Sequence, residues 1–201
     1  MLRNATAFVL VALLVSCYGR DDYEPHAGDI VFQDLASSQS EAIKLATGSK
    51  YTHCGIVFNH GGHWVVYEAV GPVKTTPLNE WIAQGVDGKY VAKRLTPLGK
   101  YLTPAVLKRM QGIADSYLGK PYDPFFEWSN ERMYCSELVW KIYYEGFGLE
   151  LAPLRRLGSY DLSADAVKEK LEDRFGKTIP RNEPVVAPSD LFESQQLFTV
   201  F

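Results

Sequence analysis

The sequence has few cysteines, no block of basic residues and, after residue 16, no long apolar run. The missing basic block and a net charge of -3 argue against a nucleic-acid partner. No segment beyond residue 16 is apolar enough to span a bilayer, and no internal repeat is present. The remaining composition is that of a globular protein. The part after residue 16, about 180 residues, is enough for one domain with a sizeable core.

The N-terminus has the pattern of a secretory signal peptide. Arg3 precedes the apolar run 5–15, which is too short to span a bilayer. The run leads to Leu14-Val15-Ser16-Cys17, which resembles the bacterial lipobox, whose cysteine becomes the lipidated first residue of the mature chain. The alternative is an ordinary cleavage site with an incidental cysteine. In both cases we expect an exported protein of the periplasm or cell envelope.

This interpretation divides the chain into three parts. Residues 1–16 are the signal peptide, and 17–27 are a lipidated N-terminus with a polar tether. Residues 28–201 then form a single domain. A lipid anchor would be the domain's only connection to a membrane.

Cys135 lies at the start of a predicted helix, 133–144, in which Leu138, Val139 and Ile142 form an apolar face. A thiol at a helix N-terminus has a lowered pKa, because the unpaired N–H groups and the helix dipole favour its thiolate. Two alternatives compete with a reactive thiol. Cys135 could be a buried structural cysteine, or it could form a disulfide with Cys54 in an exported protein.

A hairpin supplies a candidate base and its partner. The runs 53–58 and 63–70 are β-branched and aromatic, and Asn59-His60-Gly61-Gly62 is a turn signal between them. If the loop is His60-Gly61, His53 lies directly opposite Glu68 on the same face. An odd-length loop would turn Glu68 away. The pair could also be only a structural hydrogen bond.

The remaining pattern predicts alternating strands and helices. Two further strands are expected, as is a sequence of helices with capping or glycine stop signals. The strands are 30–33 and 89–95; the helices are 38–46 before Gly48, a short one started by Thr75-Thr76-Pro77-Leu78, one after Thr103-Pro104 that ends at Gly119, and one through Val167, Leu171 and Phe175. The tail after this last helix is punctuated by prolines and ends in Ser189-Asp190-Leu191-Phe192.

Several segments resemble the NlpC-type cell-wall peptidases, which are papain-type cysteine hydrolases. Leu118-Gly119-Lys120-Pro121-Tyr122 resembles their Gly-x-Pro-Tyr loop, and Tyr134-Cys135-Ser136-Glu137-Leu138-Val139 resembles their cysteine helix. Gly28-Asp29-Ile30-Val31 and His53-Cys54-Gly55-Ile56 resemble two of their strands. Those peptidases run cysteine, histidine, third residue, whereas here the order is His53, Glu68, Cys135.

This circular permutation resembles the YiiX/YebB-like family, and the likeness runs from Gly28 to about Ser189. It implies an α+β fold of the permuted papain-like type, with an antiparallel sheet or small barrel packed against helices. Two departures from the peptidase motif stand out. Glu137 replaces a glycine, which is expected to alter the substrate pocket, and Tyr134 replaces an aspartate before the cysteine, which removes a carboxylate from the substrate side.

The resemblance implies a catalytic triad of Cys135, His53 and Glu68. Cys135 would attack an amide or ester carbonyl, His53 would act as base and Glu68 would orient the imidazole. Tyr122 is expected to be an oxyanion donor or to line the substrate site, and Gln39 is a polar neighbour of this site. No cofactor is expected. A zinc site of His53, Cys54 and the two hairpin histidines is disfavoured, because neighbouring strand residues face opposite sides.

Three functions remain open at this point. The first is an exported cysteine amidase or peptidase that acts on peptides of the cell wall. The second is a lipid-directed thioesterase or acyltransferase with the same thioester chemistry. The third is a binding module that keeps the fold without turnover.

Overall fold

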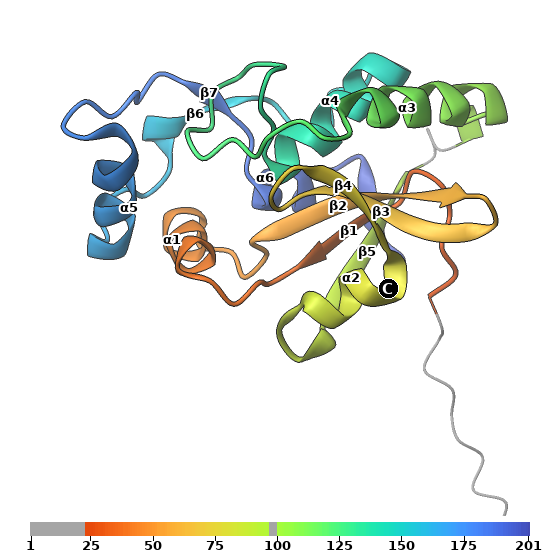
Figure 1. Cartoon of the computed structure of the whole chain (residues 1–201), viewed down its shortest axis with the longest axis horizontal. Coiled ribbons are helices and arrows are strands. Elements are labelled where there is room, and N and C mark those ends of the chain that lie inside the picture. Colours follow the sequence, from red (N-terminus) through yellow and green to blue (C-terminus); the bar gives the residue numbers. More distant parts are fainter. Residues whose placement is uncertain (1–22, 97–99) are drawn as a thin grey trace, which may run out of the picture.

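The computed structural model describes residues 23–96 and 100–201 (Figure 1). Its centre is a six-stranded antiparallel sheet in the order β4-β3-β2-β1-β5-β8. These strands are β1 (Ile30–Gln33), β2 (His53–His60), β3 (His63–Ala69), β4 (Val73–Pro77), β5 (Tyr90–Leu95) and β8 (Leu197–Thr199). A second, two-stranded sheet pairs β6 (Arg155–Arg156) with β7 (Pro184–Val185). The helices are α1 (Ser38–Thr47), α2 (Leu78–Gln84), α3 (Pro104–Tyr117), α4 (Cys135–Phe147), α5 (Asp165–Phe175) and α6 (Pro188–Phe192).

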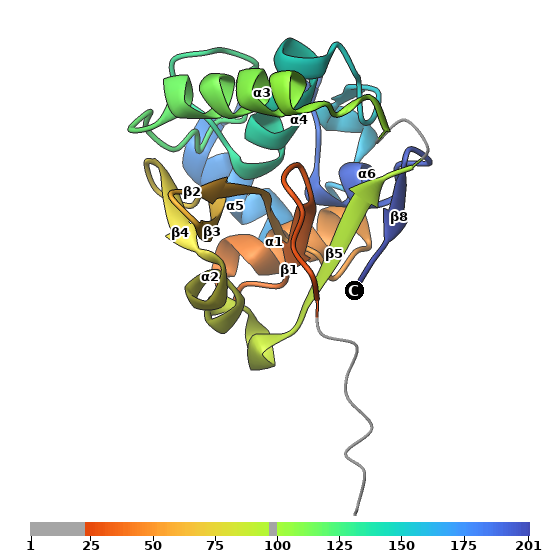
Figure 2. The same cartoon turned by 90° about the vertical axis from the view of Figure 1, so that its right-hand side faces the viewer.

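Helices cover both faces of the large sheet. In Figure 2, α3 and α4 lie above it and α2 lies below. The strand alternation explains this arrangement: Ile56 and Phe58 of β2 belong to the core that contains α4, whereas Val57 packs with Trp81 of α2. Most of the sheet is therefore buried on both sides.

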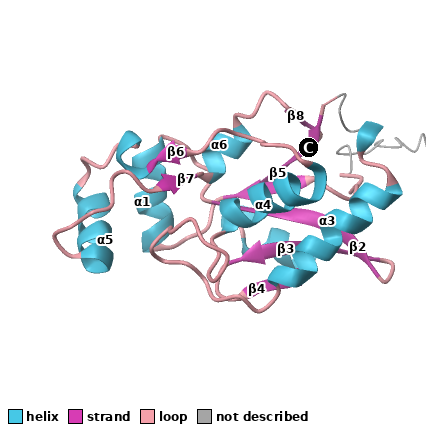
Figure 3. Ribbon diagram, turned by 90° about the horizontal axis from the view of Figure 1, so that it is seen from above, coloured by secondary structure: helices cyan, strands magenta, loops and turns pink. Residues whose placement is uncertain are grey.

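A separate lobe stands at one end of the sheet. It consists of α1, α5 and the β6–β7 ribbon, at the left of Figures 1 and 3. Its own small core joins Ala42 of α1 to Leu157, Val167, Leu171 and Val185. This α1–α5 lobe meets the main body near the N-terminus of α4, where the site described below lies.

The β2–β3 hairpin differs in register from the sequence prediction. The loop is Gly61-Gly62 rather than His60-Gly61, and His60 pairs with His63. Both glycines have positive φ, +60° and +90°, as the favoured two-residue hairpin turn requires. The shift amounts to two residues, so the faces are unchanged, but Glu68 lies diagonally across from His53 rather than directly opposite it.

Gly55 makes this diagonal contact possible. A Cβ on Gly55 would clash with the Val66 side chain and come within 2.8 Å of the Tyr67 carbonyl oxygen and 3.6 Å of the Glu68 Cβ. Without that atom, the face between His53 and Glu68 stays open, and the two side chains reach each other across the strand pair.

Several element boundaries also differ from the prediction. Ser37, not Ser38, caps α1, and its side chain accepts a hydrogen bond from the Ser40 backbone N–H. Helix α4 continues through Gly146, where the helix passes so close to Met110 of α3 that a Cβ would lie 2.5 Å from the Met110 Cγ. Gly148, in the left-handed conformation, ends α4. The missed elements β4, β6, β7, α6 and β8 have two to five residues, too few for a periodic signal.

The signal peptide and Cys17 lie outside the described residues. Residues 23–27, which the sequence assigns to the tether, lie against the domain: the Tyr23 hydroxyl donates to Asp29 Oδ2 at 2.8 Å, and Arg94 donates to the Glu24 carbonyl oxygen at 3.0 Å. In the part of the chain that the structure describes, no helix has the length and apolar character needed to cross a membrane.

Candidate active site

Cys135 is the first residue of α4, and the neighbouring β2 strand surrounds its thiol with donors. The side chain is buried, with 7% of the residue exposed. A hydrogen bond from the Cys54 thiol lowers the pKa of Cys135 well below its usual value, and so do the hydrogen bond and charge of His53. These effects outweigh burial, which alone would raise it. The arrangement favours a thiolate at position 135.

His53 and Glu68 form the polar centre of the site. His53 Nε2 lies 2.6 Å from Glu68 Oε2, and both side chains are almost fully buried. Since Nε2 is used by Glu68, Nδ1 is the ring nitrogen left for Cys135. Burial favours the neutral ring, but hydrogen bonds to Cys135 and Glu68 prevail and raise the pKa of His53 to about 9. The site thus favours an imidazolium next to a thiolate.

Three residues that the sequence analysis did not identify hold this pair in place. Thr76 of β4 donates its hydroxyl hydrogen to Glu68 Oε1 at 2.6 Å, and Lys74 Nζ lies 3.6 Å from the same oxygen. Although burial favours the protonated acid, the bonds from His53 and Thr76 lower the pKa of Glu68. Trp81 stacks on the His53 ring at a centroid distance of 5.9 Å. Strand β4 gives no clear sequence signal, so its contribution was not predictable.

Tyr122 and Gln39 meet beside Cys135. The loop that carries Tyr122 is fixed by two backbone bonds, from Met133 to the Pro121 carbonyl at 3.0 Å and from Asp123 to the Met133 carbonyl at 3.1 Å. Gln39 Nε2 donates a hydrogen bond to the Tyr122 hydroxyl oxygen. The Tyr122 proton is therefore free to be donated elsewhere. Burial and the nearby Cys135 charge raise the pKa of Tyr122, so it stays protonated.

Arg174 of α5 extends this hydrogen-bond chain. Its Nη2 donates to Gln39 Oε1 at 2.8 Å, and its guanidinium lies over the Phe126 ring, 5.1 Å from the centroid. Donors thus point in one direction, from Arg174 to Gln39 and from Gln39 to Tyr122. In such a chain each hydrogen bond polarises the next, which strengthens the last donor. Nothing in the sequence near Arg174 indicated this role.

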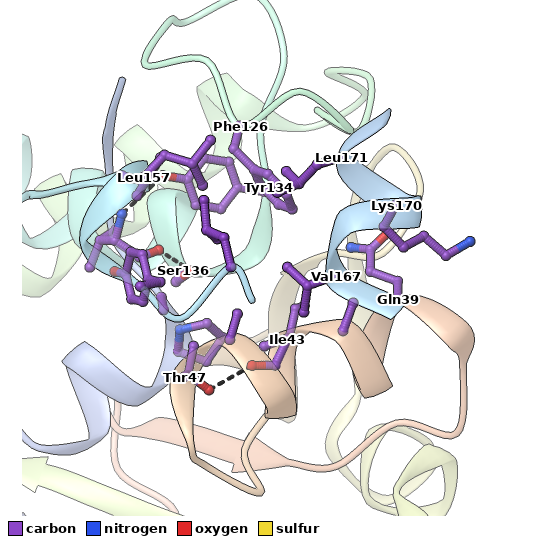
Figure 4. A pocket seen from close by; sticks show the side chains of 18 of the residues that line it. Gln39, Ile43, Thr47, Phe126, Tyr134, Ser136, Leu157, Val167, Lys170 and Leu171 are labelled. Atoms are coloured by element: carbon purple, nitrogen blue, oxygen red, sulfur yellow. Dashed lines mark hydrogen bonds between the residues drawn. The ribbon is translucent and has the colours of Figure 1, made fainter. Parts of the chain in front are cut away.

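A cavity of about 110 Å³ opens beside Cys135, between the main body and the α1–α5 lobe. Its wall is almost entirely apolar. In Figure 4, Val167 and Leu171 of α5 face it from one side, Ile43 and Thr47 of α1 from another, and Leu157 lies across from them. The full wall consists of Gln39, Ala42, Ile43, Ala46, Thr47, Tyr122, Phe126, Tyr134, Cys135, Ser136, Leu157, Tyr160, Leu162, Val167, Lys170, Leu171, Arg174 and residues 185–188.

The two departures from the peptidase motif have different outcomes. Tyr134 lines the cavity, where its hydroxyl accepts a hydrogen bond from the Val186 N–H at 3.2 Å. Glu137 does not line it, so this side chain forms no part of the cavity wall. Its carboxylate is buried behind the site, 2.7 Å from Lys141 Nζ, and burial raises its pKa to about 7.

The structure also shows where Cys54, His60 and His63 lie, which are outside the proposed triad. Within the described part of the chain, Cys54 and Cys135 both carry free thiols, although they contact each other. Cys54 is fully buried in the core, and burial raises the pKa of its thiol. His60 and His63 lie exposed at the hairpin tip. In residues 23–96 and 100–201, no three His, Cys, Asp or Glu side chains are grouped so that they could hold a metal ion.

Comparison with known proteins gives consistent matches. Residues 24–201 match a family described as "Permuted papain-like amidase enzyme, YaeF/YiiX, C92 family". The chain is 46% identical over 178 residues to the protein YiiX of Escherichia coli strain K12, a match that covers 89% of this chain and 87% of YiiX. It also resembles the crystal structure of "metalloprotein yiiX" from Escherichia coli O157:H7, with a TM-score of 0.84, 46% identity, and coverage of 89% of this chain and 98% of that one.

Proposed function

Because this chain belongs to the YaeF/YiiX family of permuted papain-like amidases, we propose that it is a cysteine amidase with Cys135, His53 and Glu68 as its catalytic triad. The observation that carries the proposal is the short buried contact between His53 Nε2 and Glu68 Oε2, 2.6 Å, on a histidine whose other nitrogen faces the Cys135 thiol. A merely structural histidine would not need a thiol with a lowered pKa beside it.

In the proposed reaction, the Cys135 thiolate attacks the carbonyl carbon of an amide and forms a C–S bond. The backbone N–H of Cys135, which lies in the first turn of α4, and the Tyr122 hydroxyl donate hydrogen bonds to the oxyanion. When this intermediate collapses, the C–N bond breaks and the leaving nitrogen takes the proton from His53. The acyl group remains on Cys135 as a thioester.

The thioester is then hydrolysed. Neutral His53 takes a proton from a water molecule, whose oxygen attacks the thioester carbonyl, and the C–S bond breaks to release the acid. This step restores the thiolate and the imidazolium. Glu68 keeps the imidazole in one orientation throughout and stabilises its positive charge.

The cavity favours an acyl chain rather than a peptide as the acyl part of the substrate. A bound peptide carries one backbone donor and one acceptor per residue, and these groups are costly to bury without partners. The apolar wall offers few partners, but it runs along α1 from Gln39 to Thr47, about 12 Å at the helical rise. An amide of an apolar acid therefore fits better than a stem peptide of the cell wall.

The experiment is a comparison of products. Wild-type protein and a Cys135→Ser variant are incubated with acylated amines and with stem peptides, and products are read by mass spectrometry. Release of a carboxylic acid by the wild type alone, with an acyl adduct on Cys135 in quenched samples, supports the proposal. No turnover of any amide or ester, with an intact and monodisperse protein, refutes it and favours a binding module.

The same cavity is equally compatible with a second function, transfer of the acyl group to an alcohol or amine instead of water. Adding an acceptor such as glycerol or ethanolamine to the reaction decides between the two. A new ester or amide that forms faster than free acid identifies an acyltransferase. Free acid alone identifies a hydrolase.

We also propose export to the cell envelope with a lipid on Cys17, as the lipobox-like sequence indicates. A Cys17→Ala variant should move from the membrane to the soluble envelope fraction. Native protein that is already soluble would contradict the anchor and leave export untouched.

A further inference from the structure

The apolar cavity has a charged rim on one side only, and the charge is positive. Lys170 and Arg174 of α5 line it, and none of the described residues that line it is aspartate or glutamate. Figure 4 shows Lys170 and Gln39 together at one side of the pocket, across from Leu157 and Thr47. The cavity thus has an apolar wall with cationic side chains at one edge.

Arg174 is held in a position that leaves donors available. One nitrogen is fixed by Gln39 Oε1 at 2.8 Å, and the face of the guanidinium rests on Phe126. An arginine has five N–H donors in a planar fork that fits a carboxylate or phosphate. A neutral amide and an aromatic ring thus hold this side chain, and no ion pair with a carboxylate of the described residues competes with a ligand for it.

The rim is also close to the reacting atoms. Arg174 contacts Gln39, Gln39 contacts Tyr122, and Tyr122 lies beside Cys135. If the acyl chain lies in the apolar part of the cavity and the carbonyl lies at Cys135, the cationic edge of the cavity is left for the amine part of the substrate. A negative group a few atoms from the amide nitrogen would then reach Arg174 and Lys170.

We propose that Lys170 and Arg174 bind an anionic group on the amine part of the substrate, so that the substrate is an acyl amide such as an N-acylated amino acid. This inference rests on the proposed amidase function and adds to it the charge of the leaving group. The bound anion would orient the scissile amide toward Cys135 and, through Gln39, hold the Tyr122 donor in place.

Binding to a Cys135→Ser variant tests the inference without turnover. The probes are N-decanoylglycine and its neutral match, N-decanoylglycinamide, measured by calorimetry at low salt. We expect the carboxylate to bind about tenfold tighter, since a charge-assisted hydrogen bond strengthens binding and partial exposure of the rim to solvent weakens this effect. N-decanoylphosphoethanolamine serves as a phosphate-bearing arm; tighter binding than the carboxylate would identify a phosphorylated amine as the source of the anion.

Substitutions at the rim then test which residues cause the preference for the anionic probe. Lys170→Glu and Arg174→Gln should each bring the ratio of the two affinities close to one or invert it. Lys168→Glu is the matched control: it is an exposed lysine of the same helix, away from the cavity and paired with Asp165. This control should keep the wild-type ratio.

Two results would overturn the inference. One is equal affinity for the charged and neutral probes in the Cys135→Ser protein. The other is a preference for the anionic probe that Lys168→Glu removes as fully as Lys170→Glu. That result would mean that the overall electrostatic potential of α5, and not direct contact with the rim residues, attracts the anion. Neither result touches the amidase proposal, which fails only if the wild type releases no acid from any amide. Conversely, an inactive protein that still prefers the anionic probe would retain the rim as a binding site.

Discussion

The proposed catalytic cluster, Cys135, His53 and Glu68, and the α1–α5 lobe are built in opposite ways. The three residues of the cluster are almost fully buried, and hydrogen bonds link His53 to both of the others. The cavity that the lobe helps to form has an apolar wall and carries its charged side chains, Lys170 and Arg174, at one edge. Under the proposed function, the central sheet and α4 hold the reacting groups, and the helices of the lobe select the substrate.

The largest expected effect is on turnover when the nucleophile is lost. Cys135→Ser keeps nearly the same volume, so folding should be preserved, but a serine is not ionised by this environment. We expect amide hydrolysis to fall by at least about 10⁴-fold. Circular dichroism checks the fold. Residual activity above about one-tenth of wild type would place the nucleophile elsewhere and remove the basis of the comparison.

Removing the charge of Glu68 should have the next largest effect. Glu68→Gln has the same shape but cannot stabilise an imidazolium, and its amide can favour the wrong ring tautomer. We expect kcat to fall about 10²- to 10⁴-fold with little loss of thermal stability. Thr76→Val, which removes the hydroxyl donor to Glu68, should have a smaller effect in the same direction. Unfolding without a loss of rate in the folded fraction would make Glu68 structural.

The buried ion pair behind the site should affect stability and not chemistry. Lys141→Met leaves the Glu137 carboxylate buried without its partner, which should destabilise the protein by about 2–4 kcal/mol. Burial raises the pKa of Glu137 to about 7 even with Lys141 beside it, and loss of Lys141 should raise it further. Glu137 is then neutral in both proteins below that value, so the destabilisation should be present above about pH 7 and should disappear as the pH falls to it. Denaturant melts at two pH values measure this. A comparable loss of kcat would extend the catalytic cluster to this pair.

The smallest expected effects are on the pH dependence of Cys135 alkylation and of turnover. With the pKa of Cys135 lowered, alkylation by iodoacetamide should stay fast well below about pH 8.5, the unperturbed value for cysteine. Turnover should decline above about pH 9, where His53 loses the proton that the leaving nitrogen needs.

His53→Ala should slow alkylation of Cys135 in mild acid, since the imidazolium is gone. Cys54 should react slowly in both proteins because it is fully buried. An alkylation profile that is ordinary and indifferent to His53 would contradict the thiolate–imidazolium pair.

Family resemblance carried much of the sequence prediction, and its coarse part is confirmed. The α+β fold of permuted papain-like type and the relation to YiiX are both found. Local signals also worked where they were strong: Thr103 caps α3, and Gly48 ends α1 in the left-handed conformation. The roles of Cys135, His53, Glu68, Tyr122 and Gln39 stay predictions.

The hairpin shows how turn chemistry sets a register. The four residues Asn59-His60-Gly61-Gly62 allow two even-length loops. The observed loop places a glycine at both positions that need positive φ, whereas the predicted loop would place His60 at one of them. Either loop keeps His53 and Glu68 on one face, so their contact was predicted although the register was wrong.

The sequence by itself determined where strands alternate, where helices are capped and where glycines end them, because these features depend on neighbours a few positions away. It therefore placed the cysteine at a helix start and the histidine and glutamate on paired strands. Only the tertiary structure decided that Thr76 holds Glu68, that Trp81 stacks on His53 and that Arg174 reaches Gln39, 135 positions earlier. Contacts at such separations depend on how whole elements pack, and no local pattern encodes them.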